Sequence, residues 1–421
     1  MSEVYLSGNS KENDMKNLRH ILALLTLILF AITGSAQQMQ KDMEVLADDK
    51  LEGREVGTAG ERAAAKYIVK RFKKLGLDPK GTDGYYQEFS VKPQYNPHAK
   101  VPADTSKAIV GNNVVGYIDN GAATTIIIGA HYDHLGFGAE GSLYEGTEPE
   151  IHNGADDNAS GVTVLLELAS TIRGKFPHNN YLFIAFSGEE KGLWGSASFT
   201  KNPTIDLATV NYMINMDMVG KLGEDRELAI YGTGTSPTWL PLLEDISKER
   251  NIDMKSKPSG VGPSDHTSFY LKDMPVLHFF TGQHDDYHKP SDDADKIDYD
   301  GLQEIHDYIT DVIARVDDKG KLEFTKTKDE DSRKAASFSV TLGVIPDYMY
   351  DGKGMLISGV REGRPAEKAG IEDGDIVLKM GEHDVPDMMG YMKALGEFKK
   401  GDKAKVIVLR GDEEVEVEVE F

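Results

Sequence analysis

Short apolar runs alternate with helical patterns along most of this chain, and this alternation constrains the fold more than any other feature. The runs typical of strands are residues 113–117, 124–128, 181–186, 211–215, 227–231 and 275–280. The helical patterns lie at residues 60–72, 162–173, 194–200, 238–250 and 301–316. Strands separated by helices indicate an α/β fold. We therefore expect an α/β three-layer sandwich with a mostly parallel central sheet.

Side chains that can bind metals follow four of the predicted strands, at the point where each strand ends. His131, Asp133 and His134 follow the strand at 124–128, and the pair Glu189 and Glu190 follows the strand at 181–186. Asp217 follows the strand at 211–215, and the segment His284–His288 follows the strand at 275–280. Ligands of open α/β sheets bind just beyond the carboxyl ends of the strands. The sequence therefore predicts one site at this edge of the sheet.

A fifth acidic segment, residues 153–161, precedes the predicted helix that starts at Val162. Asn158 and Ser160 are typical N-cap residues, because their side chains accept the first free N–H groups of a helix. The adjacent carboxylates of Asp156 and Asp157 repel each other unless a cation lies between them. This segment therefore belongs with the other candidates for a cation site.

The residue types available define the chemistry of such a site. The chain contains no cysteine, so a metal must be bound by His, Asp and Glu. Two zinc ions about 3.5–4 Å apart polarise a peptide carbonyl and activate a water near neutral pH. One carboxylate must bridge the pair, and another must take the proton from the water. The adjacent Glu189 and Glu190 can divide the roles of base and ligand.

The motifs GAHYDHLG, NGADDNASG, SGEEKGLWGS, MINMDMVG and DYHKPSDD, in this order, resemble those of the aminopeptidase Y family of di-zinc exopeptidases. The stretch LADDKLEGREVGTAGERAAAKYI is similar to the N-terminal segment of that family. The resemblance covers residues 39–316 and implies the zinc exopeptidase fold. It implies that His131, Asp156 and Asp217 hold one zinc ion. By the same resemblance Asp156, Glu190 and His288 hold the other, with Asp156 as the bridge.

The resemblance also implies roles for residues around the metal ligands. Glu189 would be the general base, Asp133 would orient His131, and Asp157 would shape its loop. The consecutive residues Ser264, Asp265 and His266 are not expected to form a serine-hydrolase relay, because the chain has no Gly-x-Ser-x-Gly elbow. They resemble a segment of the same family in which His266 would stabilise the oxyanion of the reaction.

The composition changes after Val316. Residues 317–335 are dense in Lys, Asp and Glu without periodicity, which is typical of a linker. The segment SGVREGRPAEKAGIEDGDIVLKMGEHDV resembles a PDZ domain, which implies a small, mainly-β domain over residues 336–421. PDZ domains add a peptide strand to a sheet edge. The candidate loop for this is Thr341–Pro346, and Pro346 lacks the N–H used in such pairing. Peptide binding and a structural or gating role both stay open.

The N-terminus predicts export. Lys16 and Arg19 precede the apolar run Ile21–Ile32, and small residues end at Ala36, as in a cleaved secretory signal. Residues 1–36 would be removed, with residues 1–14 outside the signal pattern and a start at Met15 fitting it better. The apolar run is shorter than the roughly 20 residues that span a bilayer. We therefore expect a periplasmic or secreted protein with no stable membrane span, and a peptidase domain over residues 37–316.

The expected function is a metallo-exopeptidase, an aminopeptidase that removes N-terminal residues from peptides with two zinc ions. The formal net charge of −23 disfavours nucleic acid as a partner. A carboxypeptidase on the same scaffold stays open, because the sequence does not show which charged group faces the cleft. A glutaminyl-cyclase-like enzyme would need one metal only, whereas His131 and Asp217 complete a second site. A non-catalytic scaffold that binds peptides through the PDZ-like domain predicts loss of metal ligands, and none is missing.

Overall fold

The computed structural model describes residues 36–421, apart from 93–106, 145, 328–339, 347–349, 351 and 361–362. The predicted export signal, residues 1–36, lies outside the described residues except for Ala36. Among the described helices, none combines the length and the apolar character that crossing a bilayer requires.

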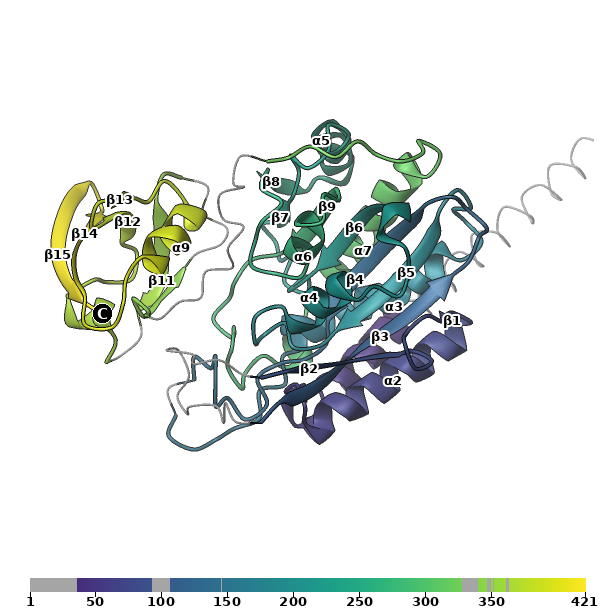
Figure 1. The fold of residues 1–421 in the computed structure, drawn as a ribbon, viewed down its shortest axis with the longest axis horizontal. Helices are drawn as coiled ribbons and strands as arrows, with labels where there is room; N and C mark the ends of the chain where they lie inside the picture. Colours follow the sequence, from purple (N-terminus) through teal and green to yellow (C-terminus); the bar gives the residue numbers. More distant parts are fainter. Residues whose placement is uncertain are drawn as a thin grey trace, which may run out of the picture.

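A mixed sheet forms the centre of the N-terminal part and, within the described residues, has nine strands (Figure 1). The strand order is β1-β3-β5-β4-β6-β9-β7-β8, with β2 paired to β3. The strands are β1 (Asp78–Pro79), β2 (Tyr86–Val91), β3 (Ile109–Ile118), β4 (Thr125–His131), β5 (Asn180–Phe186), β6 (Val210–Met216), β7 (Glu227–Tyr231), β8 (Asp253–Lys257) and β9 (Val276–Phe280). The neighbours β5, β4, β6 and β9 are parallel. Their carboxyl ends therefore share one edge of the sheet.

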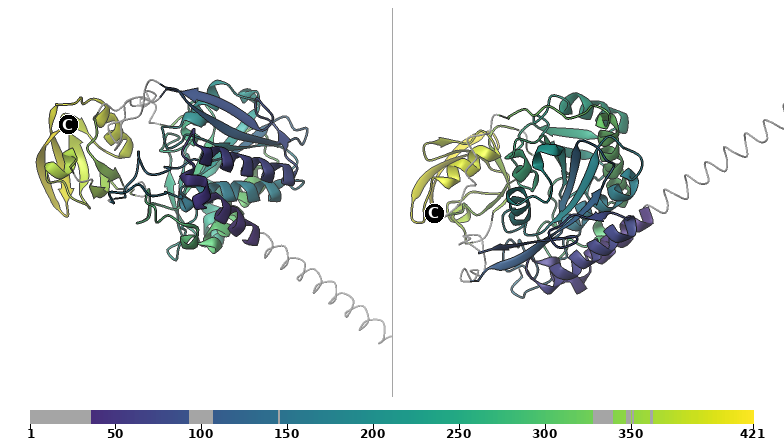
Figure 2. Two further views of the ribbon diagram at one scale, coloured as in Figure 1. Left: turned by 90° about the horizontal axis from the view of Figure 1, so that it is seen from below. Right: turned by 45° about the vertical axis from the view of Figure 1, so that its right-hand side comes forward.

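Helices cover both faces of this sheet, as the views in Figure 2 also show. One face carries α2 (Ala59–Leu75), α3 (Gly161–Ile172), α5 (Trp239–Arg250) and α7 (Tyr299–Val316), and the other carries α4 (Trp194–Lys201) and α6 (His266–Tyr270). In β4, Ile126 and Ile128 belong to the hydrophobic core on the side of α2, α3, α5 and α7, and Ile127 belongs to the core on the side of α4 and α6. All three side chains are fully buried. A strand buried on both faces is what a covered parallel sheet requires. The predicted three-layer α/β fold is confirmed.

Local residue chemistry accounts for the start and the end of α2, which lies nearest the N-terminus among these helices. The Thr58 side chain accepts a hydrogen bond from the Glu61 N–H, and the Glu61 side chain accepts one from the Gly57 N–H. The first contact satisfies an N–H group that a helix start leaves free, and the second ties the residue before the cap to the same turn. Gly76 ends the helix in the left-handed region, with φ of 72°.

The C-terminal part, yellow in Figure 1, is a second sheet whose described strands are all antiparallel. Its elements are β10 (Val344–Pro346), β11 (Met355–Val360), α8 (Pro365–Lys368), β12 (Ile376–Met380), β13 (His383–Asp384), α9 (Met388–Gly396), β14 (Lys403–Arg410) and β15 (Glu413–Glu420). It has a hydrophobic core of its own, which includes Val377, Val406 and Val408. The predicted small, mainly-β PDZ-like region is therefore confirmed as a fold.

The loop before β10 uses its polar groups within the chain. The Gly343 N–H donates to Thr341 Oγ1 at 2.9 Å, and the Leu342 carbonyl accepts from the Ala366 N–H at 2.8 Å. Gly343 has φ of 82°, and a Cβ at this position would lie 2.2 Å from the Cβ of Arg364. Glycine is therefore required here for local packing, and these contacts leave the question of peptide binding open.

Candidate metal centre

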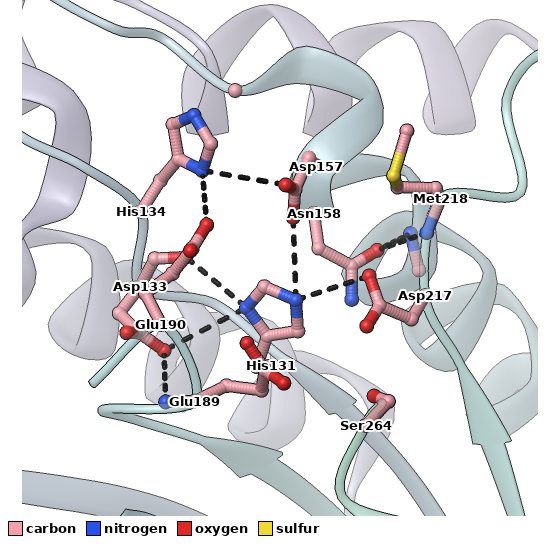
Figure 3. Close-up of polar contacts among 12 residues, drawn as sticks. His131, Asp133, His134, Asp157, Asn158, Glu189, Glu190, Asp217, Met218 and Ser264 are labelled. Carbon is pink, nitrogen blue, oxygen red and sulfur yellow. Dashed lines mark hydrogen bonds and ion pairs between the residues drawn. The ribbon is translucent and has the colours of Figure 1, made fainter. Parts of the chain in front are cut away.

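The metal-capable side chains meet at the carboxyl edge of the four parallel strands (Figure 3). His131 is the last residue of β4, Glu189 and Glu190 follow β5, Asp217 follows β6, and His288 lies on the segment after β9. Asp157 joins them from η2 (Ala155–Ser160), an irregular turn that leads into α3. The site that the strand ends predict is thus assembled from five segments of the chain.

The first group of ligand-type atoms surrounds His131. Its Nε2 lies 3.3 Å from Asp157 Oδ1 and 3.1 Å from Asp217 Oδ1. Its Nδ1 lies 3.2 Å from the Asp133 carbonyl oxygen, which is a hydrogen-bond acceptor. The proton of a neutral imidazole therefore belongs on Nδ1, and the lone pair of Nε2 faces the two carboxylates. Metal-binding histidines are usually held in this way.

The second group surrounds His288. Its Nε2 lies 3.2 Å from Asp157 Oδ2 and 3.4 Å from Glu190 Oε2. Its Nδ1 lies 2.9 Å from the Gly141 carbonyl oxygen, so Nε2 again faces the carboxylates. Asp157 therefore lies between the two imidazoles and offers one carboxylate oxygen to each.

These distances can be tested against zinc. A tetrahedral zinc ion with bonds of about 2.0–2.2 Å places its ligand atoms roughly 3.3–3.5 Å from one another. The four nitrogen–oxygen distances in the two groups run from 3.1 to 3.4 Å. Two nitrogen lone pairs that each face two carboxylates also need a cation between them. The residues present therefore fit two metal ions that share Asp157.

A third histidine, His134, lies against the same carboxylates. Its Nδ1 is 2.7 Å from Glu190 Oε1 and 3.9 Å from Asp157 Oδ2, and these three residues also form a compact group. The shorter distance is that of a direct hydrogen bond, which is too close for two ligands of one ion. His134 therefore fits a donor that orients Glu190, a role that the sequence did not indicate.

The electrostatics of the cluster favour positive charge. Burial alone would lower the pKa of His131, but the carboxylates of Asp217, Asp133 and Asp157 raise it well above its usual value. Burial also opposes protonation of His288, yet Glu190 and Asp157 raise its pKa to about 9. The surrounding carboxylates therefore favour a positive charge between them, which a bound metal ion would supply in exchange for protons.

Glu189 lies beside the two groups without joining them. Its backbone N–H donates to Asp133 Oδ1 at 3.1 Å. Burial raises the pKa of its side chain well above the usual value, and the charges of Asp217 and Glu190 add to this while His131 opposes it. A carboxylate with a raised pKa next to a metal site is suited to accept and return a proton.

The structure corrects the assignment of Asp156 as the bridging ligand. Its Oδ1 accepts the Gly220 N–H at 2.6 Å, and its Oδ2 lies 3.1 Å from His284 Nε2. Asp157 has near-extended dihedrals, with φ of −106° and ψ of 91°. Neighbouring side chains on an extended backbone point to opposite sides, so the two adjacent carboxylates do not face the same imidazoles. Asp157, expected only to shape the loop, takes the position between His131 and His288.

The two residues predicted as helix caps and the segment around His266 form the following contacts. Asn158 Oδ1 accepts the Gly161 N–H at 2.9 Å at the start of α3, and the Ser160 hydroxyl accepts the Val219 N–H. Ser264 Oγ accepts a hydrogen bond from Asn215, and neither ring nitrogen of His266 has a partner among the described residues, so the two do not form a relay. His266 is buried and stacks on His278 with ring centroids 4.4 Å apart. Burial lowers the pKa of His266 to about 3, which keeps its ring neutral.

Three buried charged residues near the cluster were not singled out from the sequence, namely Arg54, Glu61 and Asp292. Asp292 accepts the backbone N–H groups of Asp156 and Asp157 at 3.0 and 3.1 Å. Glu61 accepts hydrogen bonds from the hydroxyls of Tyr132 and Ser187, which flank the ends of β4 and β5. These contacts join residues 71 to 136 positions apart along the chain, so no local pattern reveals them.

Comparison with known families and proteins identifies two parts of the chain. Residues 113–313 match the family model for peptidase family M28, and residues 322–421 match that for the PDZ domain. Aminopeptidase YwaD of Bacillus subtilis is 28% identical over 196 residues, which are 44% of this chain and 39% of YwaD. A probable leucine aminopeptidase of Arthroderma otae is 29% identical over 173 residues, 39% of this chain and 45% of that protein. The chain spans less than half the length of these two relatives.

Solved structures share the fold at low sequence identity. BSAP, a zinc aminopeptidase from Bacillus subtilis, superposes with a TM-score of 0.54 at 18% identity, over 68% of this chain and 95% of that one. A glutaminyl cyclase from Bacteroides thetaiotaomicron superposes with a TM-score of 0.52 at 19% identity, over 66% and 97% of the two chains. The fold is therefore common to proteins with different reactions.

Proposed function

Because residues 113–313 match the model of peptidase family M28 and residues 322–421 match that of the PDZ domain, we propose that this protein is an exported zinc aminopeptidase. It removes single residues from the free N-termini of peptides. The observation that carries the proposal is the position of Asp157, which offers one oxygen to His131 and the other to His288.

Two sets of residues that share one carboxylate would hold two zinc ions. His131, Asp157 and Asp217 would hold the first ion, and Asp157, Glu190 and His288 would hold the second. The Asp133 and Gly141 carbonyls fix the tautomers of the two imidazoles. The bound ions would polarise the scissile carbonyl and lower the pKa of the attacking water.

The residues around the ions move the protons of the reaction. Glu189 accepts the proton of the attacking water and returns it to the leaving amine, a use for which its raised pKa is suited. His266 donates a hydrogen bond toward the oxyanion. In support of that role, neither ring nitrogen of this buried, neutral imidazole has a protein partner in the described structure.

Two kinds of support favour an aminopeptidase over the other reactions. The relatives YwaD and that of Arthroderma otae carry aminopeptidase names. The glutaminyl cyclase shares only the fold, whereas here two complete groups of imidazole and carboxylate atoms lie side by side, which favours a two-metal reaction. A carboxypeptidase on this scaffold is the second candidate, and it differs in the terminus of the peptide that it needs.

The remaining parts of the proposal concern the termini. Residues 1–36 direct export, residues 37–316 form the peptidase domain, and residues 317–335 link it to the PDZ domain at 336–421. The PDZ domain either binds a peptide along its sheet edge or contributes to the structure alone.

Removal of the metal is expected to abolish peptide hydrolysis reversibly. Dialysis against a chelator should leave less than about 1% of the activity on a leucyl anilide, because water activation and carbonyl polarisation are lost together. Two equivalents of zinc should restore it. The loss of the ions should also lower the midpoint of thermal unfolding, since metal bound only by the folded state stabilises it.

A substrate panel assayed on the zinc-loaded protein separates the candidate reactions. Hydrolysis of the leucyl anilide and none of its N-acetyl counterpart is the expected pattern. Release of C-terminal residues from N-blocked peptides would instead establish a carboxypeptidase. Cyclisation of an N-terminal glutaminyl peptide without hydrolysis would establish a cyclase, and inactivity toward the whole panel would contradict the proposed enzyme.

A further inference from the structure

Arg54, at the end of η1 (Asp49–Arg54), is the most deeply buried of the described lysines and arginines, with 1% of its surface exposed. Its guanidinium group donates only to backbone carbonyls. Nε donates to the Tyr132 oxygen at 2.7 Å, and Nη2 donates to the Gly154 oxygen at 2.9 Å. Nη1 donates to the Asn153 oxygen at 2.5 Å and also to the Leu46 oxygen.

Three of these carbonyls belong to the two segments that carry opposite sides of the metal centre. Tyr132 directly follows His131, and the carbonyls of Asn153 and Gly154 immediately precede the turn that presents Asp157. One rigid group thus joins the end of β4 to the start of η2. Arg54 itself lies outside the matched family region, 113–313.

The backbone around Arg54 strengthens this connection. The Gly53 carbonyl accepts the Gly136 N–H at 3.0 Å, and the Gly136 carbonyl accepts the His152 N–H at 2.8 Å. A Cβ on Gly53 would lie 2.5 Å from the His152 oxygen and 2.6 Å from the Gly136 oxygen. The segment at 53–54 is therefore wedged tightly between the two segments that its side chain ties together.

The chemistry of these contacts calls for arginine. A guanidinium group holds five N–H donors in a fixed planar fork, whereas lysine has three donors at a single point. A buried cation without a direct carboxylate partner is costly. Burial lowers the pKa of Arg54, and the negative charges nearby limit the decrease, so that the pKa is about 10. These charges are those of Asp133, Asp157, Asp292 and Glu190. The group therefore stays cationic at neutral pH.

We propose that Arg54 is a positioning residue that sets the spacing between His131 and Asp157 by holding the backbones of both segments in one guanidinium fork. It acts on the metal centre through those backbones and touches neither ion nor substrate. The inference rests on the proposed two-metal site, but it does not depend on which reaction the site performs.

The test uses the full chain carrying Arg54→Gly. Its zinc affinity is measured by competition with a chelator, and its visible spectrum is recorded after Co²⁺ has replaced zinc. The substitution suits the backbone, since Arg54 has φ of 50°, a conformation that glycine adopts readily. Zinc affinity should fall about 10–100-fold, the usual cost of losing a group that orients metal ligands. The Co²⁺ spectrum should change because it reports ligand geometry. Added guanidinium ion at millimolar concentration should restore both properties, and sodium chloride at equal ionic strength should not.

Arg71 provides the matched control, because it is another buried arginine of the N-terminal segment and its guanidinium pairs with Asp42 at 2.8 Å. Arg71→Ala should lower the midpoint of thermal unfolding while leaving zinc affinity and the Co²⁺ spectrum as in the wild type. This separates a loss of general stability from a displaced metal site.

The outcomes distinguish this inference from the proposed function. Wild-type zinc affinity and spectrum in Arg54→Gly would overturn it, and tighter zinc binding would show that only the charge of Arg54 matters. If Arg54→Gly fails to fold, Arg54→Lys should still bind zinc at least about tenfold more weakly, because an ammonium group cannot span the carbonyls. Wild-type zinc affinity in Arg54→Lys would also refute the proposal that the guanidinium group holds the two backbone segments. Failure of the wild type to bind two zinc ions would count against the proposed function instead.

Discussion

Glu189→Gln is expected to reduce peptide hydrolysis by about 10²–10⁴-fold, the usual contribution of a positioned general base, while the protein keeps two bound zinc ions. Glutamine preserves the size of the side chain but cannot accept a proton. The Glu189 carboxylate is outside the sets of oxygens that contact His131 and His288 in the described structure. The measurement pairs kcat on a leucyl anilide with zinc content by elemental analysis.

Glu88→Gln is the matched control, because Glu88 is exposed on β2. This substitution removes the same charge at a position away from the metal centre. It should keep both the activity and the zinc content of the wild type. Substantial activity in Glu189→Gln would show that another group takes the proton. Loss of one zinc ion in that variant would show that Glu189 is a ligand and not a base.

Asp157→Asn is expected to weaken zinc binding by more than about 100-fold and to abolish measurable hydrolysis. A shared carboxylate serves both ions, so its loss should exceed the 10–100-fold cost of losing an outer partner. Asp156→Asn should keep zinc affinity within about tenfold of the wild type. Its side-chain contacts are to the Gly220 N–H and His284, and neither of these belongs to the groups of ligand-type atoms around His131 and His288.

These adjacent variants control for each other, since each removes one carboxylate from the same turn. Zinc affinity should be measured by competition with a chromophoric chelator, together with the midpoint of thermal unfolding in the presence of a chelator. A larger loss of affinity in Asp156→Asn than in Asp157→Asn would contradict the geometry. Equal losses would mean that the turn, rather than one carboxylate, determines binding.

The parts of the fold that the sequence predicts are the elements with strong periodicity. β4, β5, β6 and β9 are fully buried along their lengths, so each appears as a mostly apolar run. β8 at the sheet edge has the sequence DMKSK and is only partly buried, so it carries no such signal. α6 has five residues, too few for a helical period to appear.

The candidate site was predictable to the level of the segments that form it. Metal-capable residues lie at the carboxyl ends of four parallel strands, and the topology alone brings them to one edge. The choice between Asp156 and Asp157 depends on the dihedral angles of η2, which neighbouring residues of equal chemistry do not reveal. Arg54 was hidden for a different reason, since its acceptors Tyr132 and Gly154 lie 78 and 100 residues away.

The most direct test of the central claim is an anomalous difference map at the zinc absorption edge, from crystals of the zinc-loaded protein. Two peaks about 3.5–4 Å apart, with the Asp157 carboxylate between them, are the predicted result. His131 and Asp217 should flank one peak, and Glu190 and His288 the other. A single peak, or two peaks bridged by Asp156, would contradict the account.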